Sequence, residues 1–386
     1  MCKIFQIRNL TLHFNTFEGT VRALENVNLD MYEGETLGLV GETGCGKTVT
    51  ARSLMRLMAP NTRVLNGEIT FEGEDVLQMS EQKLEEIRGN KISMVFQDPM
   101  RALNPTMKIG DQIAEVVMLR SRKEMYRRAV DTTSDRLRQL SGRSPLKSLI
   151  LRAHSKFLSL EAEKKHLGLL RLSSALPFLG KYKDHLREAV QHQVVKMLKE
   201  VQIPNPSVVA DQYSHELSGG MRQRVMIAMA LACNPKLLIA DEPTTALDVT
   251  VQARILKLMQ GLKNRFNTST LLVTHNLGVV AEICDRVAVM YAGTVVELGD
   301  VHTMFRRPAH PYTRGLMEAI RTLGGRRRDI RIIKGMVPSL LNPPPGCRFH
   351  PRCDCAVPVC KVNTPKMIEI EAEHFVACHL LGECKS

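Results

Sequence analysis

Short apolar runs recur along the chain, each bounded by polar residues or glycine, and such runs are typical of buried strands. The clearest lie at residues 35–40, 237–240 and 270–273. Helix-forming residues separate them, and a helix is predicted over residues 48–58, where Pro60 provides a natural stop. Apolar strands that alternate with helices predict an α/β domain with a parallel-sheet core.

Other segments depart from this alternation. Residues 286–298 have a β pattern with Ala292-Gly293 at the predicted hairpin turn. Residues 119–188 place leucines at roughly helical spacing between glycines and prolines, which predicts helices inserted between loops. From Arg306 onward Pro, Arg and then Cys accumulate, so we place a boundary near Val301 and expect domains 1–301 and 302–386.

The length of 386 residues exceeds the roughly 250–300 at which one core stops growing, which also favours a large domain with an appendage. A hydrophobic share of 44% and a charged share of 24% are ordinary for a globular chain and argue against disorder throughout. We find neither about 18 consecutive apolar residues nor an apolar N-terminal stretch. The expectation is a chain that neither spans a membrane nor carries a signal peptide.

The net charge of +13 is concentrated in one place. Residues 119–188 contain 17 Lys or Arg and 7 Asp or Glu, which accounts for ten of those charges. The remainder of the chain is nearly balanced. A solvated helical face is the simplest interpretation of this basic insertion, and contact with anionic lipid headgroups is the alternative. The insertion has few aromatic residues and no recognised binding motif, so nucleic acid is not expected.

A glycine-rich loop follows the first buried run directly. Gly41-Glu42-Thr43-Gly44-Cys45-Gly46-Lys47-Thr48 has the spacing of a phosphate-binding loop, between a predicted strand and a predicted helix. Its backbone N–H groups can face a polyphosphate, and the helix N-terminus favours an anion. We expect Lys47 to reach the β and γ phosphates and the Thr48 hydroxyl to ligate Mg²⁺.

Two carboxylates close the second buried run, where Asp241 and Glu242 follow Ala240. Asp241 is expected to hold Mg²⁺, and Glu242 to act as the general base for the attacking water. His275 follows the third run and is placed to contact the γ-phosphate. Because a lone histidine at a strand end is more often structural, its role depends on the other residues.

The segment Leu217-Ser218-Gly219-Gly220-Met221-Arg222-Gln223-Arg224 resembles the signature motif of ABC-transporter ATPases. This resemblance implies a P-loop ABC fold, with a parallel-sheet core, an antiparallel β subdomain and a helical subdomain that contains the basic insertion. It implies a head-to-tail dimer in which Ser218, Gly219 and Gly220 cap the ATP on the partner's loop. Further implied roles are the Q-loop glutamine and magnesium ligand Gln97, the D-loop Ala246-Leu247-Asp248, the switch histidine His275, and the adenine-stacking Phe17, with Phe14 as an alternative.

A narrower resemblance rests on Tyr213-Ser214-His215-Glu216, on His310-Pro311-Tyr312-Thr313 and on the final cysteines. These are similar to the D-type ATPase subunit of dipeptide, oligopeptide and nickel importers. The resemblance implies an ATP-hydrolysing subunit that powers an importer by dimer closure. It also implies a second, related ATPase, two transmembrane permeases, an extracytoplasmic peptide-binding protein, and a peripheral location on the cytoplasmic face of the cell membrane.

Cysteines gather near the end of the chain, and their spacing alone leaves a [4Fe–4S] cluster, Zn²⁺ and free thiols open. The same family resemblance implies a [4Fe–4S] cluster, because Cys347-Arg348-Phe349-His350-Pro351-Arg352-Cys353 follows the arrangement found there. The expected ligands are Cys347, Cys353, Cys360 and Cys378. A structural role is expected, since so short a region buries little surface by itself.

Two rival functions agree less well with the sequence than transport. An ABC protein acting on ribosomes or DNA would usually carry two ATPase domains or a coiled-coil arm, whereas this chain has one phosphate loop and no sustained heptads. A redox enzyme built on the cysteines would need a second cofactor site, for which the sequence offers no motif.

Overall fold

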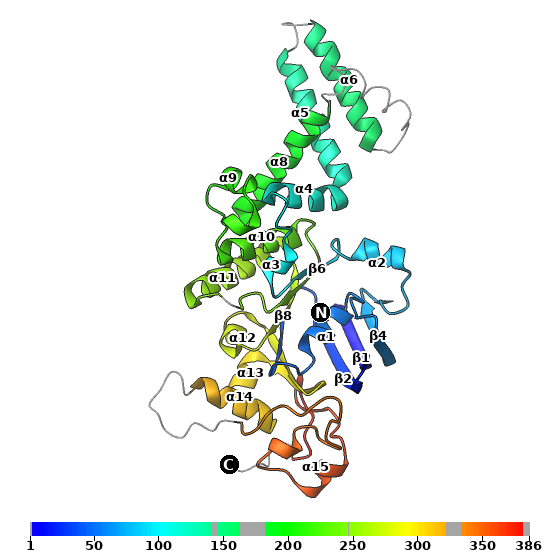
Figure 1. Ribbon diagram of the computed structural model, residues 1–386, viewed down its shortest axis with the longest axis vertical. Coiled ribbons are helices and arrows are strands. Elements are labelled where there is room, and N and C mark those ends of the chain that lie inside the picture. The colour runs from blue at the N-terminus through cyan, green and yellow to red at the C-terminus, as the bar shows by residue number, and fades with distance from the viewer. Residues whose placement is uncertain (1, 141–144, 163–181, 246, 322–332, 381–386) are drawn as a thin grey trace. The chain divides into compact units, whose positions relative to one another are not determined.

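The computed structural model describes residues 2–140, 145–162, 182–245, 247–321 and 333–380. Figure 1 shows the chain as a ribbon. The chain divides into two compact units, residues 1–97 with 234–386 and residues 98–233. Within the described residues, no helix is both long and apolar enough to cross a membrane.

An eight-stranded sheet runs through the described part of the first unit. Its central strands are parallel and fully buried, which confirms the α/β core predicted from the apolar runs. Its other strands are antiparallel, and residues 292–293 form the predicted hairpin turn. In sheet order the strands are β11 (Ile368–Glu371), β12 (His374–Val376), β10 (Thr294–Asp300), β9 (Arg286–Tyr291), β3 (Thr36–Val40), β8 (Ser269–Thr274), β7 (Leu237–Asp241) and β6 (Ile92–Val95).

A second sheet in this unit is antiparallel, as the family resemblance implied. Its order is β2 (Gly19–Tyr32), β1 (Lys3–Thr16), β4 (Thr62–Phe71) and β5 (Glu74–Asp75). Apolar side chains of both sheets, such as Leu10 and Leu39, belong to one continuous buried core. The two sheets therefore stabilise each other by burying their apolar faces together.

Helices connect and cover the strands of the first unit. They are α1 (Lys47–Ser53), α2 (Glu81–Ile87), α11 (Val249–Phe266), α12 (Leu277–Ile283), α13 (Val301–Arg306), α14 (Pro311–Arg321) and α15 (Pro358–Val362). The helix α1 is shorter than the predicted 48–58, because turns follow Ser53 and Arg56 has a left-handed φ of 49°. Its start at Lys47 agrees with the prediction, since the glycine loop ends there.

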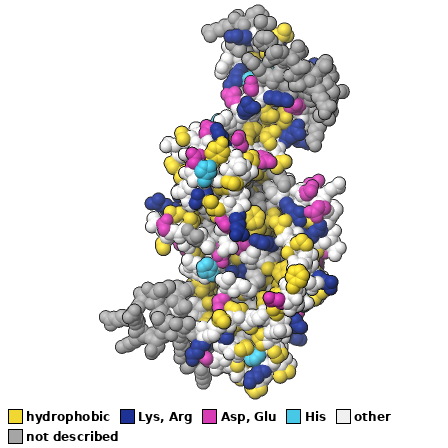
Figure 2. All heavy atoms as spheres, viewed as in Figure 1, with side chains coloured by type: hydrophobic (Ala, Val, Ile, Leu, Met, Phe, Trp, Pro, Cys, Tyr) yellow, Lys and Arg dark blue, Asp and Glu magenta, His cyan; other side chains and the backbone are white. Residues whose placement is uncertain are grey.

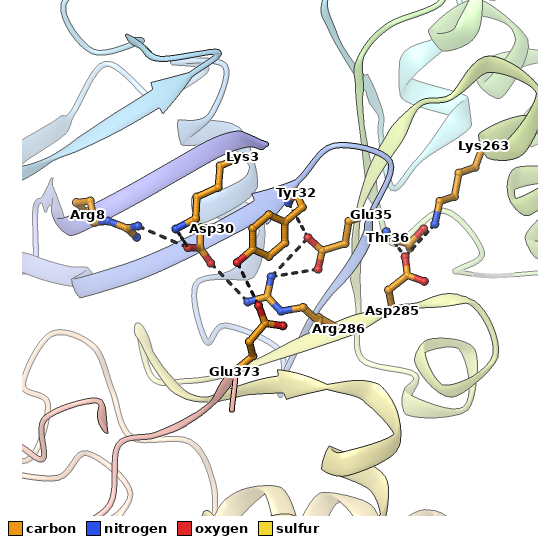
Figure 3. Close-up of polar contacts among 10 residues, drawn as sticks. All are labelled: Lys3, Arg8, Asp30, Tyr32, Glu35, Thr36, Lys263, Asp285, Arg286 and Glu373. Carbon is orange, nitrogen blue, oxygen red and sulfur yellow. Dashed lines mark hydrogen bonds and ion pairs between the residues drawn. The ribbon is translucent and has the colours of Figure 1, made fainter. Parts of the chain in front are cut away.

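A network of charged side chains joins β9 of the large sheet to the end of β2 in the antiparallel sheet (Figure 3). Arg286 on β9 pairs with Glu35 at 3.2 Å and with Asp30 at 3.5 Å, and its guanidinium lies 5.2 Å from the ring centroid of Tyr32. The Tyr32 hydroxyl donates to Glu373, at 3.4 Å, in the turn between β11 and β12. Because Arg286 and Glu35 are buried, removing either charge would leave the other unpaired and destabilise the fold.

The C-terminal residues pack onto the same unit. Strand β12 extends the large sheet by pairing with β10. The carboxylate of Glu297 on β10, fully buried, accepts from the backbone N–H groups of Ala309 and His310, at 2.8 and 2.9 Å, and contacts His374 Nε2 at 2.8 Å. The segment at residues 309–310 and strand β12 are thus both anchored to the buried carboxylate of Glu297.

The second unit is helical in its described residues. It contains α3 (Pro99–Ala102), α4 (Ile109–Arg120), α5 (Arg122–Leu140), α6 (Pro145–Ala162), α8 (Tyr182–Glu200), α9 (Pro206–Ala210) and α10 (Gly219–Leu231). The prediction of inserted helices in the basic segment is confirmed for α5, α6 and α8, which pack on one another. A pair such as Arg136 with Glu188, at 2.6 Å, partly neutralises the insertion, and Figure 2 shows basic and acidic side chains interspersed on its visible face.

Candidate functional site

The glycine loop joins β3 to α1, as predicted. Gly41 has a φ of 154°, and a Cβ atom there would lie 2.2 Å from the backbone oxygen of Met290 on β9. Gly46 has a φ of 102° and leaves no room for a side chain between Leu24 and the backbone of Ala23. Close packing against the neighbouring strands therefore requires glycine at both positions. The loop backbone is held further by the N–H of Gly293, which donates to the Cys45 oxygen at 2.8 Å.

Lys47 turns back into the loop. Its ammonium donates to the backbone oxygens of Gly41 at 2.8 Å and of Glu42 at 3.1 Å, and the residue is only 5% exposed. A buried ammonium held by neutral carbonyl groups and the Cys45 sulfur is well suited to an incoming anion, because a phosphate offers it a stronger partner. The phosphate-contacting role of Lys47 stays a prediction, and its position at the end of the loop is compatible with it.

Thr48 and Asp241 come together from different elements. The Thr48 hydroxyl, in the first turn of α1, donates to the Asp241 carboxylate at the end of β7 at 3.1 Å. Asp241 is 1% exposed, and burial raises its pKa above the usual value. A hydroxyl and a buried carboxylate are the hard oxygen donors that Mg²⁺ prefers, so these two residues fit the predicted ion.

Glu242 is the centre of a second cluster. Its carboxylate accepts from Gln97 Nε2 at 3.1 Å and from the Thr245 hydroxyl at 2.8 Å, and lies 3.1 Å from His275 Nδ1. Burial works to raise the pKa of Glu242, but the bonds from His275 and Thr245 and the charge of Lys47 outweigh it and lower the pKa. The carboxylate is therefore ionised at neutral pH and can polarise a water molecule.

Three residues predicted at separate points of the sequence, Gln97, Glu242 and His275, thus meet at one place. The Gln97 side-chain amide donates its N–H to Glu242, whereas the Thr48 hydroxyl donates to the other acid, Asp241. Thr245 was not predicted, although a hydroxyl residue three positions after Glu242 is a signal that could have found it.

The aromatic candidates differ in their surroundings. Phe17 lies in the turn between β1 and β2 and is fully exposed, so its ring has a free face. Phe14, on β1, packs against the buried core. The structure therefore favours Phe17 over Phe14 as the residue able to stack on a base.

The signature segment lies in the second unit. Ser218 caps the N-terminus of α10, accepting from the Met221 N–H at 3.4 Å, and Gly219 and Gly220 form the first turn. Ser218 is exposed, and an exposed helix start with glycine N–H groups suits an anion. In the first unit, Asp248 caps α11 by accepting from Val251 N–H at 2.9 Å, whereas Ala246 lies outside the described residues.

The prediction of a [4Fe–4S] cluster, with zinc as the alternative, is wrong. Among the described residues, no three His, Cys, Asp or Glu side chains are placed so that they could hold a metal ion. Burial raises the pKa of Cys347 to about 11, and it raises the pKa of Cys353 above its usual value. The expected ligands were Cys347, Cys353, Cys360 and Cys378.

The C-terminal region is stabilised by contacts that the sequence did not reveal. The prediction rested on the family resemblance of the cysteine segment, and the structural role expected for the cluster assumed that the C-terminal region buries little surface by itself. Instead Phe349 is buried against the rings of Tyr291 and Tyr312, at centroid distances of 5.1 and 5.4 Å, and Arg348 pairs with Glu25 at 3.0 Å. Packing on the first unit supplies the buried surface that a metal was expected to replace. A cysteine-centred domain is accordingly not confirmed.

The phosphate loop, the acids that end β7 and the signature helix together define an ATP-binding cassette. Two solved structures share the fold, each at 23% identity and a TM-score of 0.52. One is a dimeric ATP-binding cassette bound to ADP and Pi, matched over 77% of this chain and 98% of that one. The other is cbiO1 of Clostridium perfringens, part of an ABC transporter complex, matched over 80% and 92%.

Sequence relatives narrow the class. The family model "ABC transporter" matches residues 24–245, and "Oligopeptide/dipeptide transporter, C-terminal region" matches residues 296–360. A probable peptide ABC transporter ATP-binding protein of Sinorhizobium fredii is 42% identical over 97% of this chain and 94% of its own length. The dipeptide transport ATP-binding protein of Bacillus subtilis is 39% identical over 98% of this chain and 95% of its own length. The oligopeptide transport ATP-binding protein of the same organism is 40% identical over 98% of this chain and 89% of its own length.

This chain belongs to the ABC transporter family, in the group whose ATP-binding proteins end in the oligopeptide/dipeptide transporter C-terminal region. It is an ABC-type ATPase, as the sequence predicted.

Proposed function

We propose that this protein binds and hydrolyses ATP to power the import of dipeptides or oligopeptides. The observation that carries the proposal is the convergence of Gln97, Glu242 and His275 beside the phosphate loop. The names of the sequence relatives support peptides as the cargo class.

In this proposal the chain's own residues divide the work. Lys47 and the N–H groups of residues 41–48 hold the triphosphate, and Phe17 stacks on the adenine. Mg²⁺ held by Thr48, Asp241 and Gln97 would neutralise charge on the phosphates. The ionised Glu242 accepts a proton from the attacking water, and His275 fixes the orientation of that carboxylate.

The assembly extends beyond one chain. Ser218, Gly219 and Gly220 cap the nucleotide held by a second, related ATPase subunit, so that ATP favours the closed dimer and hydrolysis removes that preference. Two transmembrane permeases would turn closure into transport, with an extracytoplasmic peptide-binding protein delivering the cargo. The chain would lie peripherally on the cytoplasmic face of the cell membrane.

Two finer assignments belong to the same proposal. The basic insertion at residues 119–188 presents a solvated helical face, whose ten excess positive charges would also allow contact with anionic lipid headgroups, and no nucleic-acid partner is expected. The boundary near Val301 separates the ATPase domain from residues 302–386, supported by the C-terminal family match at residues 296–360.

Replacing the general base tests the catalytic part. In the assembled transporter, Glu242→Gln is expected to retain ATP binding and to lower turnover at least about 100-fold, because the amide cannot accept the proton. Phosphate release and nucleotide retention would be measured on the same preparation. Glu371→Gln is the matched control, since Glu371 is an exposed β11 residue paired with Arg307.

Turnover of Glu242→Gln equal to that of Glu371→Gln would remove Glu242 from the mechanism. Retained ATP binding by Lys47→Ala would remove the phosphate loop as the nucleotide site.

A further inference from the structure

Arg352 uses its whole guanidinium in contacts within the first unit. It lies in the short 3-10 turn His350–Arg352, and its side chain is only 7% exposed. Nε donates to the Lys334 oxygen at 2.9 Å and Nη2 to the Gly335 oxygen at 3.1 Å. Two of its nitrogens therefore anchor a preceding segment of the C-terminal region.

The third nitrogen reaches the phosphate loop, 310 residues earlier in the chain. Nη1 donates to both carboxylate oxygens of Glu42, at 3.0 and 3.2 Å, and to the Tyr291 hydroxyl at 3.3 Å. The guanidinium carbon also lies 5.7 Å from the centroid of the Tyr291 ring. A planar guanidinium held at several points fixes the Glu42 side chain in one orientation.

The backbone of Glu42 is held from the same side. Its N–H donates to the hydroxyl of Tyr312 at 3.0 Å, and Tyr312 is fully buried in α14. Tyr312 and Tyr291 contact each other, with ring centroids 4.7 Å apart. Residues after 301 thus contact both the side chain and the backbone of the second loop position.

A carboxylate at this position is unfavourable for an anion-binding loop. The backbone oxygen of Glu42 accepts from Lys47 Nζ at 3.1 Å. The Glu42 side chain therefore begins close to the ammonium that is expected to contact the phosphates. A like charge so close to a triphosphate would weaken binding unless another group neutralised it. Arg352 is the cation that meets the Glu42 carboxylate among the described residues.

We propose that Arg352 is a positioning residue for nucleotide binding, which neutralises the Glu42 carboxylate and keeps it turned away from the triphosphate. The C-terminal region thereby sets the ATP affinity of a loop that it does not belong to. This inference rests on the proposed function, because it requires that the loop bind ATP.

Two substitutions are expected to change the affinity for Mg-ATP in opposite directions. Arg352→Gln leaves the Glu42 charge exposed to ATP and is expected to weaken Mg-ATP binding about tenfold, equivalent to about 1.4 kcal/mol. Glu42→Gln removes that charge and is expected to tighten binding severalfold. Both changes break the same ion pair, so a purely structural brace would make both weaken binding. Affinities would be measured by titration calorimetry on the full chain.

Two more variants complete the cycle. The double variant Arg352→Gln with Glu42→Gln is expected to bind at least threefold more tightly than Arg352→Gln alone, since the repulsive charge is gone. Arg352→Lys keeps the positive charge and should bind within about threefold of the parent chain. Arg307→Gln is the matched control, because Arg307 makes an exposed pair with Glu371 in the same region. Circular dichroism verifies folding of each variant.

The outcomes separate the two levels of the proposal. One outcome is that the parent chain binds Mg-ATP, Lys47→Ala abolishes this binding, and Arg352→Gln binds Mg-ATP as tightly as Arg307→Gln. The positioning role of Arg352 is then overturned, while the proposed function stands. Weaker Mg-ATP binding by Glu42→Gln also overturns the positioning role. The Glu42→Gln measurement decides the question even where Arg352→Gln fails to fold. A parent chain that binds no Mg-ATP overturns the proposed function itself.

Discussion

His310 illustrates how a single buried side chain can make stability depend on pH. The residue is 1% exposed, and its Nδ1 accepts from the Tyr312 N–H at 3.1 Å. Burial lowers the pKa of His310 to about 4, against the opposing charge of Glu297 and with a smaller contribution from Arg314. The imidazole is therefore neutral in the folded protein near neutral pH. In the unfolded chain, with a pKa of 6.5, the same imidazole takes up a proton at a higher pH.

This difference predicts acid sensitivity. The depressed pKa contributes stability that is present above pH 6.5 and is lost as the pH falls toward 4. Between pH 7.5 and pH 5 the loss amounts to about 2 kcal/mol for this group. His310→Asn keeps an acceptor but cannot be protonated, so the fall in unfolding free energy should be smaller by about that amount. Denaturant titrations at both pH values would measure it, and equal falls in the two chains would contradict the assignment.

At the scale of elements, the turn into the cysteine segment depends on one glycine. Gly346 has a φ of 67°, and a Cβ there would lie 2.4 Å from the backbone oxygen of Cys360. The Cys347 N–H donates to that same oxygen at 2.8 Å, so the turn and α15 are in direct backbone contact. Backbone atoms cannot move aside as a flexible side chain could.

Gly346→Ala is therefore expected to lower the unfolding free energy by about 3 kcal/mol or more, since it adds a backbone clash to left-handed strain. Gly73→Ala is the matched control, because Gly73 has a φ of 82° but nothing within 4 Å of its Cβ position. The control should cost about 1 kcal/mol. Thermal and denaturant unfolding would compare the two, and equal losses would mean that the contact with Cys360 is unimportant.

At the scale of the whole molecule, the question is whether residues 302–386 are an independent domain. Their strand β12 pairs with β10, His374 meets the buried Glu297, and Phe349 packs on Tyr291. We expect a chain that ends at Val301 to melt at least about 10 °C below the parent, because these contacts are lost together. Differential scanning calorimetry would measure both. A truncated chain as stable as the parent would show that the ATPase domain folds independently of the remainder.

Much of the candidate site could be predicted because its residues sit in local patterns. The glycine spacing before Lys47 has one well-understood use, and acids that end a buried strand must lie at one edge of the sheet. The cluster prediction at residues 347–378 was wrong because a family resemblance in cysteine arrangement does not distinguish metal ligands from thiols buried by packing. Nothing near Arg352 in the sequence indicates that it bonds the phosphate loop, since the two are brought together only by the fold.

The sequence by itself determined the α/β core, the phosphate loop and the acids beside it, because each depends on neighbours within a few residues or on the period of a strand. Only the tertiary structure decided that Glu242 gathers Gln97, Thr245 and His275, and that the C-terminal region is built on buried aromatic rings and a buried carboxylate. The physical reason is that pairing of distant charges and rings is selected by burial, which no local pattern records.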